Sequence, residues 1–277
     1  MLPSPPPPNQ QPTFLFGRKA ELGKHAAQNS SATIVICLAN VGVGLLFLDE
    51  LNGALQSAYD AIGIPTIPAD SWDGMPLWAV CLIGIAAKDL VDYWNHRLMH
   101  TRWVWPAHAA HHSDTHVNAF TAYRVHFLET LIMTLSYILL LSWLQMPQAI
   151  PAVAVLAILH NQYVHMDLDF DHGPLRFVIA SPVFHRWHHA DLPEAHGKNL
   201  ANVMPLYDLI FGTYYNPGPC RAAMGARSSG IEDKDPVAIF LHPFRDWAGL
   251  VRRALARRGG EPRRAPRSGT APRIRAR

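Results

Sequence analysis

Five histidines lie within 17 residues of each other in the segment 96–112, which reads HRLMHTRWVWPAHAAHH. The first two are spaced as HxxxH and the last three as HxxHH. They are His96, His100, His108, His111 and His112. On a helix, residues three or four apart lie on one face with Cβ atoms about 5–6 Å apart. Imidazoles at that spacing can share one metal ion or a pair of metal ions.

The HxxHH pattern recurs far downstream, in the segment HRWHH that contains His185, His188 and His189. With 16 histidines in 277 residues, chance predicts this pattern roughly 0.05 times in the chain, yet it occurs twice. The alternative is a set of hydrogen-bonded core histidines. Eight such imidazoles without a shared ion would leave many donors and acceptors to satisfy. The clusters therefore favour a metal site.

Imidazole nitrogen suits zinc, copper, iron and nickel. A structural zinc site needs only four ligands, usually with cysteine among them. The cysteines here, Cys37, Cys81 and Cys220, are scattered and show no CxxC spacing. Eight or more histidines fit two metal ions better. Neutral ligands leave two divalent ions nearly fully charged, which suits a dinuclear iron centre that activates O₂; zinc can also fill such a site.

The elements that must position these histidines are expected to be membrane helices. Charged residues make up 16% of the chain, against about 25% in typical soluble domains. Four apolar runs of different length are candidates for crossing a bilayer: 31–48, 75–87, 127–146 and 148–163. The sequence therefore predicts an all-α, multi-pass membrane protein with about four transmembrane helices and a cytoplasmic, histidine-rich helical cap.

The second and third runs make specific structural predictions. Lys88 and Asp89 follow the second run, so this helix should leave the bilayer there and continue into His96. We expect residues 103–106 to turn the chain so that HxxxH and the first HxxHH face each other. Only Pro147 and its neighbours separate the third run from the fourth, which predicts a helical hairpin.

Charge placement predicts the topology. Residues 49–74 carry five acidic residues and no lysine or arginine, whereas the segments before the first run and between the second and third are basic. By the positive-inside rule, the basic segments are cytoplasmic. Four crossings then place both termini and both histidine clusters on the cytoplasmic side.

The chain divides into three parts. Residues 1–30 are expected to be a disordered, proline-rich leader followed by a basic interfacial segment. Residues 31–217 form the membrane-embedded domain. Residues 218–277 form a C-terminal segment with eleven arginines from Arg245 onward. We expect this tail to be a disordered basic arm, and association with anionic lipid headgroups is the alternative. Nucleic-acid binding is not expected, since the tail offers no interleaved aromatic residues.

The order HxxxH, HxxHH, distant HxxHH within four apolar runs resembles the fatty acid hydroxylase/sterol desaturase superfamily, the membrane-bound histidine-box di-iron oxygenases. Flanking segments are similar too. They are 92–97 (DYWNHR), 123–129 with its R-x-H-x-x-E element, 173–175 (GPL) and 206–214 (LYDLIFGTY). The resemblance covers roughly residues 75–217.

This resemblance implies site residues. The metal ligands would be His96, His100, His108, His111, His112, His185, His188 and His189, with a further ligand from the end of the fourth apolar run. His165 is the first choice there, and His160 and Asn161 are additional candidates, followed by Asp169 and His172. The carboxylates of Asp89, Asp92, Glu129 and Asp208 are placed to orient ligand imidazoles by accepting their other N–H group.

The resemblance also implies a reaction. Two non-haem iron ions, O₂ and electrons from an external donor, of the ferredoxin or cytochrome b5 type with its reductase, would hydroxylate or desaturate a C–H bond of a lipid such as a fatty acyl chain or sterol. We find no flavin or NAD fingerprint and no fused cytochrome b5-like module. The alternatives are a membrane zinc-dependent hydrolase and a non-catalytic metal-binding membrane protein that use the same histidines.

Overall fold

The computed structural model describes residues 48–146, 149–226, 229, 231 and 236–258. This part of the chain is helical, and its only β feature is an isolated bridge between Ala190 and Met224. The α-helices are α3 (Leu48–Ala61), α4 (Leu77–Met99), α5 (Trp105–His112), α6 (Phe127–Leu144), α7 (Ile150–Val164), α8 (Pro182–His188), α9 (Leu206–Phe211) and α10 (Pro236–Arg258). Short 3-10 turns occupy Ala69–Trp72, Thr121–Tyr123 and Gly173–Phe177. The predicted all-α class is confirmed for these residues.

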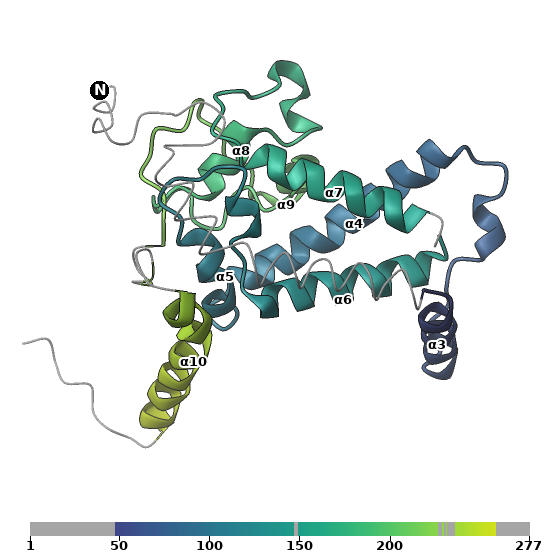
Figure 1. The fold of residues 1–277 in the computed structure, drawn as a ribbon, viewed down its shortest axis with the longest axis horizontal. Helices are drawn as coiled ribbons and strands as arrows, with labels where there is room; N and C mark the ends of the chain where they lie inside the picture. The colour runs from purple at the N-terminus through teal and green to yellow at the C-terminus, as the bar shows by residue number, and fades with distance from the viewer. Residues whose placement is uncertain (1–47, 147–148, 227–228, 230, 232–235, 259–277) are drawn as a thin grey trace, which may run out of the picture.

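Helices α4, α6 and α7 form the long body of the molecule (Figure 1). Their shared core includes Val80 on α4, Leu141 on α6 and Val153 on α7, all at most 2% exposed. Gly84 permits the close approach of α4 and α7, because a Cβ there would lie 3.1 Å from the Val153 side chain. As predicted, α4 continues without interruption from its apolar first half to the histidines at its end.

Helices α6 and α7 form the expected hairpin. The chain leaves α6 through Gln145, which adopts a left-handed conformation with φ of 51°. It then enters α7 at Ile150, and the Tyr137 hydroxyl donates to the Ile150 carbonyl oxygen at 2.7 Å. The hairpin thus returns the chain to the end of the molecule where α6 began (Figure 1).

Among the described residues, one helix is long and apolar enough to cross a membrane, namely α6 with 18 residues. Helix α7 is apolar but has only 15 residues. The first expected crossing, residues 31–48, lies outside the described residues except for Leu48, which begins α3. The number of crossings and the side on which the termini lie therefore stay predictions.

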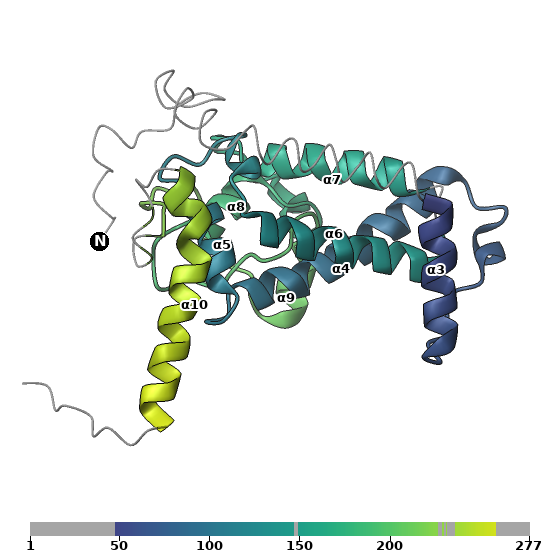
Figure 2. The ribbon, with the colours of Figure 1, turned by 60° about the horizontal axis from the view of Figure 1, so that its bottom comes forward.

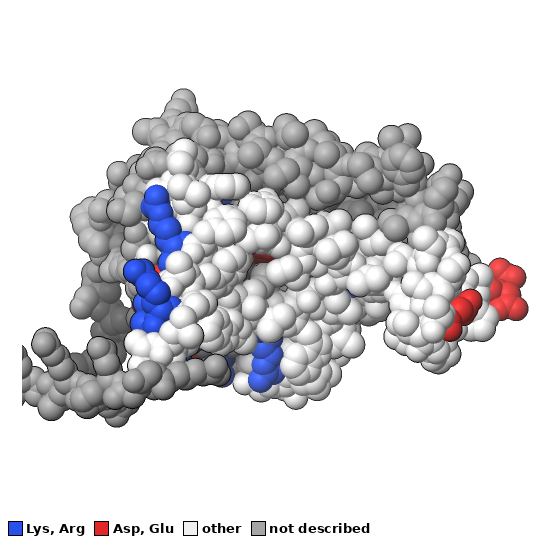
Figure 3. Space-filling model, turned by 90° about the horizontal axis from the view of Figure 1, so that it is seen from below, with Lys and Arg blue, Asp and Glu red and all other residues white. Residues whose placement is uncertain are grey.

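The two ends of the long body differ in charge. Helix α3 and the loop that follows it lie at one end, where Asp60, Asp70 and Asp73 are exposed. Helices α5, α8, α9 and α10 gather at the other end, where the exposed side chains include Arg102 and Arg245. Figure 3 shows red and blue side chains at opposite ends of one face, with an almost uncharged stretch between them.

The expectation of a disordered arm from Arg245 onward is wrong as far as Arg258, because residues 236–258 form helix α10. Arginine is a good helix former, and the basic residues alternate with apolar ones at helical spacing. The high arginine content of this segment favoured a solvated arm, whereas the spacing of its apolar residues favours a helix. The leader at 1–30 and residues 259–277 lie outside the described residues.

Candidate metal centre

The predicted turn between the first two histidine motifs is present. Helix α4 ends at Met99, with His100 as its C-cap, and α5 begins at Trp105 with a proline in its first turn. Proline is favoured there because its missing N–H group needs no partner at the start of a helix. The turn places the His100 and His108 rings with centroids 5.0 Å apart. HxxxH and HxxHH therefore face each other.

Five imidazoles meet at this corner and form group A. Each offers one ligand atom, and all five atoms lie within 4.8 Å of one another. The members of group A are His96, His100, His108, His112 and His188. Helix α8 supplies the last of them, so the distant second HxxHH does join the first. The Nε2 atom of His108 lies 3.1 Å from that of His96 and 3.2 Å from that of His112.

Four further imidazoles form group B, again with ligand atoms within 4.8 Å of one another. The members of group B are His111, His165, His185 and His189. His165 follows directly after α7 and lies at the centre, because its Nε2 atom is 2.9–3.3 Å from the Nε2 atoms of the other three. The groups adjoin, since the rings of His112 and His189 have centroids 4.6 Å apart.

Backbone carbonyls fix the tautomers of three of these rings. The Nδ1 atoms of His96, His165 and His188 donate to the carbonyl oxygens of Leu200, Asn161 and Lys198 at 2.7, 2.6 and 2.8 Å. A carbonyl oxygen only accepts, so Nδ1 carries the proton. A neutral ring then has a bare lone pair on Nε2, and that atom is the one that faces the other histidines.

This arrangement fits a bound cation. Lone pairs of neighbouring Nε2 atoms at about 3 Å repel each other unless a positive charge lies between them. The Nε2 atom of His188 is buried and has no hydrogen-bond partner among the described residues. Buried polar atoms without partners are rare and call for an explanation such as an ion. The two groups therefore have the donor set for two metal ions.

Burial keeps the imidazoles in the metal-binding form. Loss of solvent is the main cause that lowers the pKa of His108, His112, His185 and His189 well below its ordinary value, and neighbouring histidines lower it further. Burial lowers the pKa of His165 to about 4. The hydrogen bond that its Nδ1 atom donates to the Asn161 carbonyl oxygen raises this pKa, but by less. At neutral pH these rings are uncharged, as ligation requires.

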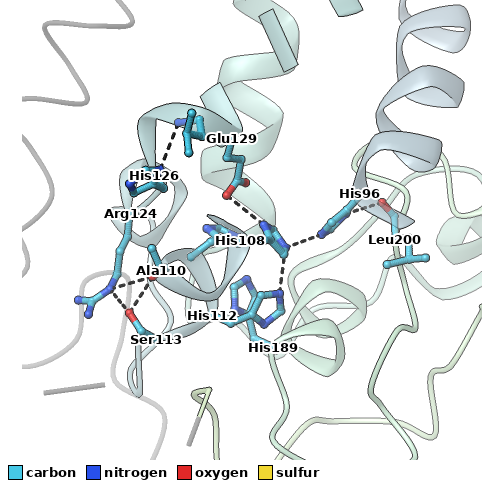
Figure 4. Close-up of polar contacts among 12 residues, drawn as sticks. His96, His108, Ala110, His112, Ser113, Arg124, His126, Glu129, His189 and Leu200 are labelled. Atoms are coloured by element: carbon cyan, nitrogen blue, oxygen red, sulfur yellow. Dashed lines mark hydrogen bonds and ion pairs between the residues drawn. The ribbon is translucent and has the colours of Figure 1, made fainter. Parts of the chain in front are cut away.

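Glu129 contacts a group A imidazole directly. Its Oε2 atom lies 3.0 Å from the Nδ1 atom of His108, and both side chains are buried (Figure 4). A carboxylate in this place holds Nδ1 as the protonated atom and turns Nε2 toward the other histidines. Helix α6 positions Glu129 in its first turn.

The residues before Glu129 hold the surrounding helices. The Arg124 Nε atom donates to the Ser113 Oγ atom at 2.8 Å and to the Ala110 carbonyl oxygen at 3.3 Å, at the C-terminal end of α5 (Figure 4). The Nδ1 atom of His126 accepts from the Leu128 N–H group and so caps α6. The R-x-H-x-x-E element thus ties α5 to α6 next to group A.

The expectation that Asp89, Asp92 and Asp208 accept directly from ligand imidazoles is corrected by their contacts. Asp92 pairs with Lys88. Asp89 accepts from the N–H groups of residues 202–204 at 2.6–3.0 Å. Asp208 accepts from the Leu200 and Ala201 N–H groups at 2.7 and 2.9 Å and from the Thr213 hydroxyl at 2.6 Å. Asp89 and Asp208 therefore hold the loop that follows Asn199, and this loop carries the Leu200 carbonyl that orients His96.

The remaining candidates lie outside both groups. His160 is partly buried and contacts the Tyr163 ring, with centroids 5.7 Å apart. Asn161 takes part through its backbone carbonyl, which orients His165. Asp169 pairs with Arg221, and the Nε2 atom of His172 lies 3.0 Å from the Tyr163 hydroxyl. Sequence reasoning missed the carbonyls of Leu200, Lys198 and Asn161, because every residue type carries such a group and no side-chain pattern marks it.

Comparison with known proteins agrees with this geometry. Residues 81–213, which contain all nine histidines of groups A and B, match the fatty acid hydroxylase family. This part of the chain is therefore similar to that family, which confirms the resemblance drawn from the histidine motifs.

Three relatives show how far the similarity extends. Alkylglycerol monooxygenase of Danio rerio is 31% identical over 145 residues, which cover 52% of this chain and 31% of the relative. Ornithine lipid hydroxylase OlsE of Rhizobium tropici is 30% identical over 178 residues, 63% of this chain and 52% of the relative. Protein CER1-like 2 of Arabidopsis thaliana is 27% identical over 65% of this chain and 30% of the relative. The chain thus spans between 30% and 52% of the length of these three relatives. No solved structure matches it significantly.

Proposed function

We propose that this protein is a membrane-bound di-iron enzyme that uses O₂ and external electrons to hydroxylate, or desaturate, a C–H bond of a lipid. The observation that carries the proposal is the convergence of nine buried or partly buried imidazoles in two adjoining groups. The names of two relatives, a monooxygenase of alkylglycerols and a hydroxylase of ornithine lipids, support an oxidoreductase that acts on a lipid.

In this proposal group A holds one metal ion and group B the other. Iron bound there would supply the O₂ activation and the oxidising power that no side chain provides. The chain holds the imidazoles neutral, and the carbonyls of Leu200, Lys198 and Asn161 together with Glu129 direct their lone pairs. Burial of the ligands keeps bulk water away from the reacting groups.

The body of the molecule supports a lipid substrate taken from a membrane. Helices α6 and α7 expose leucines and other apolar side chains, among them Leu131, Leu135 and Leu159. Each helix has one end at the histidine groups: α6 begins next to His108, and α7 ends directly before His165. We place the protein in the membrane as a multi-pass protein, with the histidine end on the cytoplasmic side, where an electron donor of the ferredoxin or cytochrome b5 type reaches it.

A direct test is lipid analysis of cells that express the protein, with His189→Ala as the inactive variant and His160→Ala as the matched control outside both groups. We expect a new hydroxylated or unsaturated lipid with the parent protein and with His160→Ala, and none with His189→Ala. Incorporation of ¹⁸O from labelled O₂ identifies hydroxylation. A product whose oxygen comes from water would refute the proposal and favour a hydrolase.

A further inference from the structure

Helix α10 carries an apolar stripe whose side chains remain about half exposed or more in the described structure. The stripe consists of Val237, Phe240, Phe244, Val251 and Leu255, each between 44% and 66% exposed. Their intervals are three, four, seven and four residues, which place them on one narrow face of a helix. Exposed apolar side chains are common singly, but an aligned row of five marks an interaction surface.

The side of α10 that carries Leu250 packs on the rest of the molecule. Leu250 is 5% exposed, and the helix packs on α5. The Trp247 indole donates to the Trp103 carbonyl oxygen at 2.7 Å, and the Nε2 atom of His126 donates to the Phe240 carbonyl oxygen at 3.1 Å. The helix is therefore fixed to the histidine end of the molecule with its stripe turned outward.

Helix α10 is oriented across the long helices of the body and contacts the start of α6. In both Figure 1 and Figure 2, α10 lies across the direction of α4, α6 and α7, at the end where α6 begins. Its Phe240 ring stacks on Phe127, the first residue of α6, with centroids 5.4 Å apart. The exposed stripe of α10 thus adjoins the end of α6, which is the helix among the described residues that is long and apolar enough to cross a membrane.

Helix α3 lies across the same direction at the opposite end of α6. Its Tyr59 hydroxyl donates to the Leu139 carbonyl oxygen at 2.8 Å, and Gln56 donates to the Ser142 carbonyl oxygen at 2.6 Å. The 18 residues of α6 rise about 27 Å, close to the roughly 30 Å of a bilayer's hydrocarbon core. With α6 across the bilayer, as the proposed function has it, α3 and α10 lie at the levels of the two membrane surfaces.

Charge distinguishes the surface that α10 meets. Arg245 and Arg252 are exposed and, at 100° per residue, lie about 60–80° from Val237, along one border of the stripe. Arginines beside an apolar row are the pattern of a helix that lies in a membrane interface and binds anionic headgroups. The exposed side chains at the α3 end are acidic instead, namely Asp60, Asp70 and Asp73.

We infer that α10 lies in the surface of an anionic membrane leaflet, with its apolar stripe among the acyl chains and Arg245 and Arg252 at the headgroups. This contact fixes the histidine end of the protein at the membrane surface. It is independent of the metal chemistry, since no member of the stripe belongs to group A or group B.

Spin labels on the full chain test this inference. In a background without Cys37, Cys81 and Cys220, a nitroxide is attached at Val251→Cys or, as the matched control on the far face of the same helix, at Arg253→Cys. The protein is placed in nanodiscs of phosphatidylcholine with or without phosphatidylglycerol. Collision rates are measured with O₂, which enters lipid, and with a water-soluble nickel chelate.

We expect a several-fold higher ratio of O₂ to nickel collisions at Val251 than at Arg253, and a further increase with phosphatidylglycerol. The increase should vanish in Arg245→Gln/Arg252→Gln. Equal ratios at the two positions would overturn the inference. So would dipolar coupling between Val251 labels of two chains, which would show that a second copy covers the stripe. An unchanged response of the double variant to phosphatidylglycerol would overturn the role of the arginines.

Discussion

Replacing Glu129 should weaken metal binding at group A and leave metal binding at group B unchanged. Its contact with an imidazole is with His108 in group A, at 3.0 Å, and no group B histidine is in contact with it. Loss of a carboxylate that orients a ligand histidine lowers metal affinity by about 10–100-fold, which equals about 1.4–2.7 kcal/mol.

We therefore expect Glu129→Gln to lower the affinity for one of the two metal ions by about tenfold, and Glu129→Ala to lower it by up to about a hundredfold. The glutamine oxygen still accepts from His108 Nδ1, but without the negative charge. Metal retained by the full chain is measured by mass spectrometry after equilibration with increasing chelator. One ion should leave at a lower chelator concentration, and the other should keep the parent's dependence.

Glu194→Gln is the matched control, because it removes an exposed carboxylate and should leave both ions unchanged. Thermal unfolding of each variant reports whether the fold is kept. The reasoning is refuted if Glu129→Ala holds both ions as tightly as the parent. It is equally refuted if a folded Glu129→Ala loses both ions together, since the contact reaches only group A.

Three further outcomes follow from the structure. His165→Ala should lose the group B ion while His160→Ala keeps both, as measured by metal content; equal loss would contradict the central place of His165. Asp208→Ala leaves the buried N–H groups of Leu200 and Ala201 without an acceptor and should lower the free energy of unfolding by about 2 kcal/mol or more, measured by denaturant titration. The metal-free protein should lose stability with acid: the pKa of His165 is about 4 in the fold and about 6.5 in the unfolded chain, so the unfolded state binds more protons between these values. Its contribution is complete above pH 6.5 and declines toward pH 4; a melting temperature that is constant from pH 7 to pH 5 would contradict this.

The histidine groups could be predicted because their signal is local. Spacings of three and four residues specify which rings share a helix face, and the turn before α5 follows from a proline near the helix start. The continuation of α4 into His96 and the break between α6 and α7 depend likewise on nearby residues. The division into group A and group B could not be predicted, because His111 and His112 are adjacent in sequence yet belong to different groups.

What the sequence left open depends on distant contacts. Asp89 and Asp208 looked like partners of imidazoles because they are acidic and near the motifs. Asp89 instead binds a loop more than a hundred residues away along the chain. Asp208 binds the backbone of Leu200, which is near in sequence but belongs to the same loop. Helix α10 was hidden by its arginines, which suggested a solvated arm. Its helical spacing becomes meaningful only when one face is seen to pack on α5.

Metal content of the anaerobically purified full chain tests the central claim most directly. The proposed function predicts close to two iron ions per chain. His188→Ala should remove the ion of group A, and His111→Ala should remove that of group B. A single zinc ion per chain, together with turnover that does not need O₂, would contradict the account.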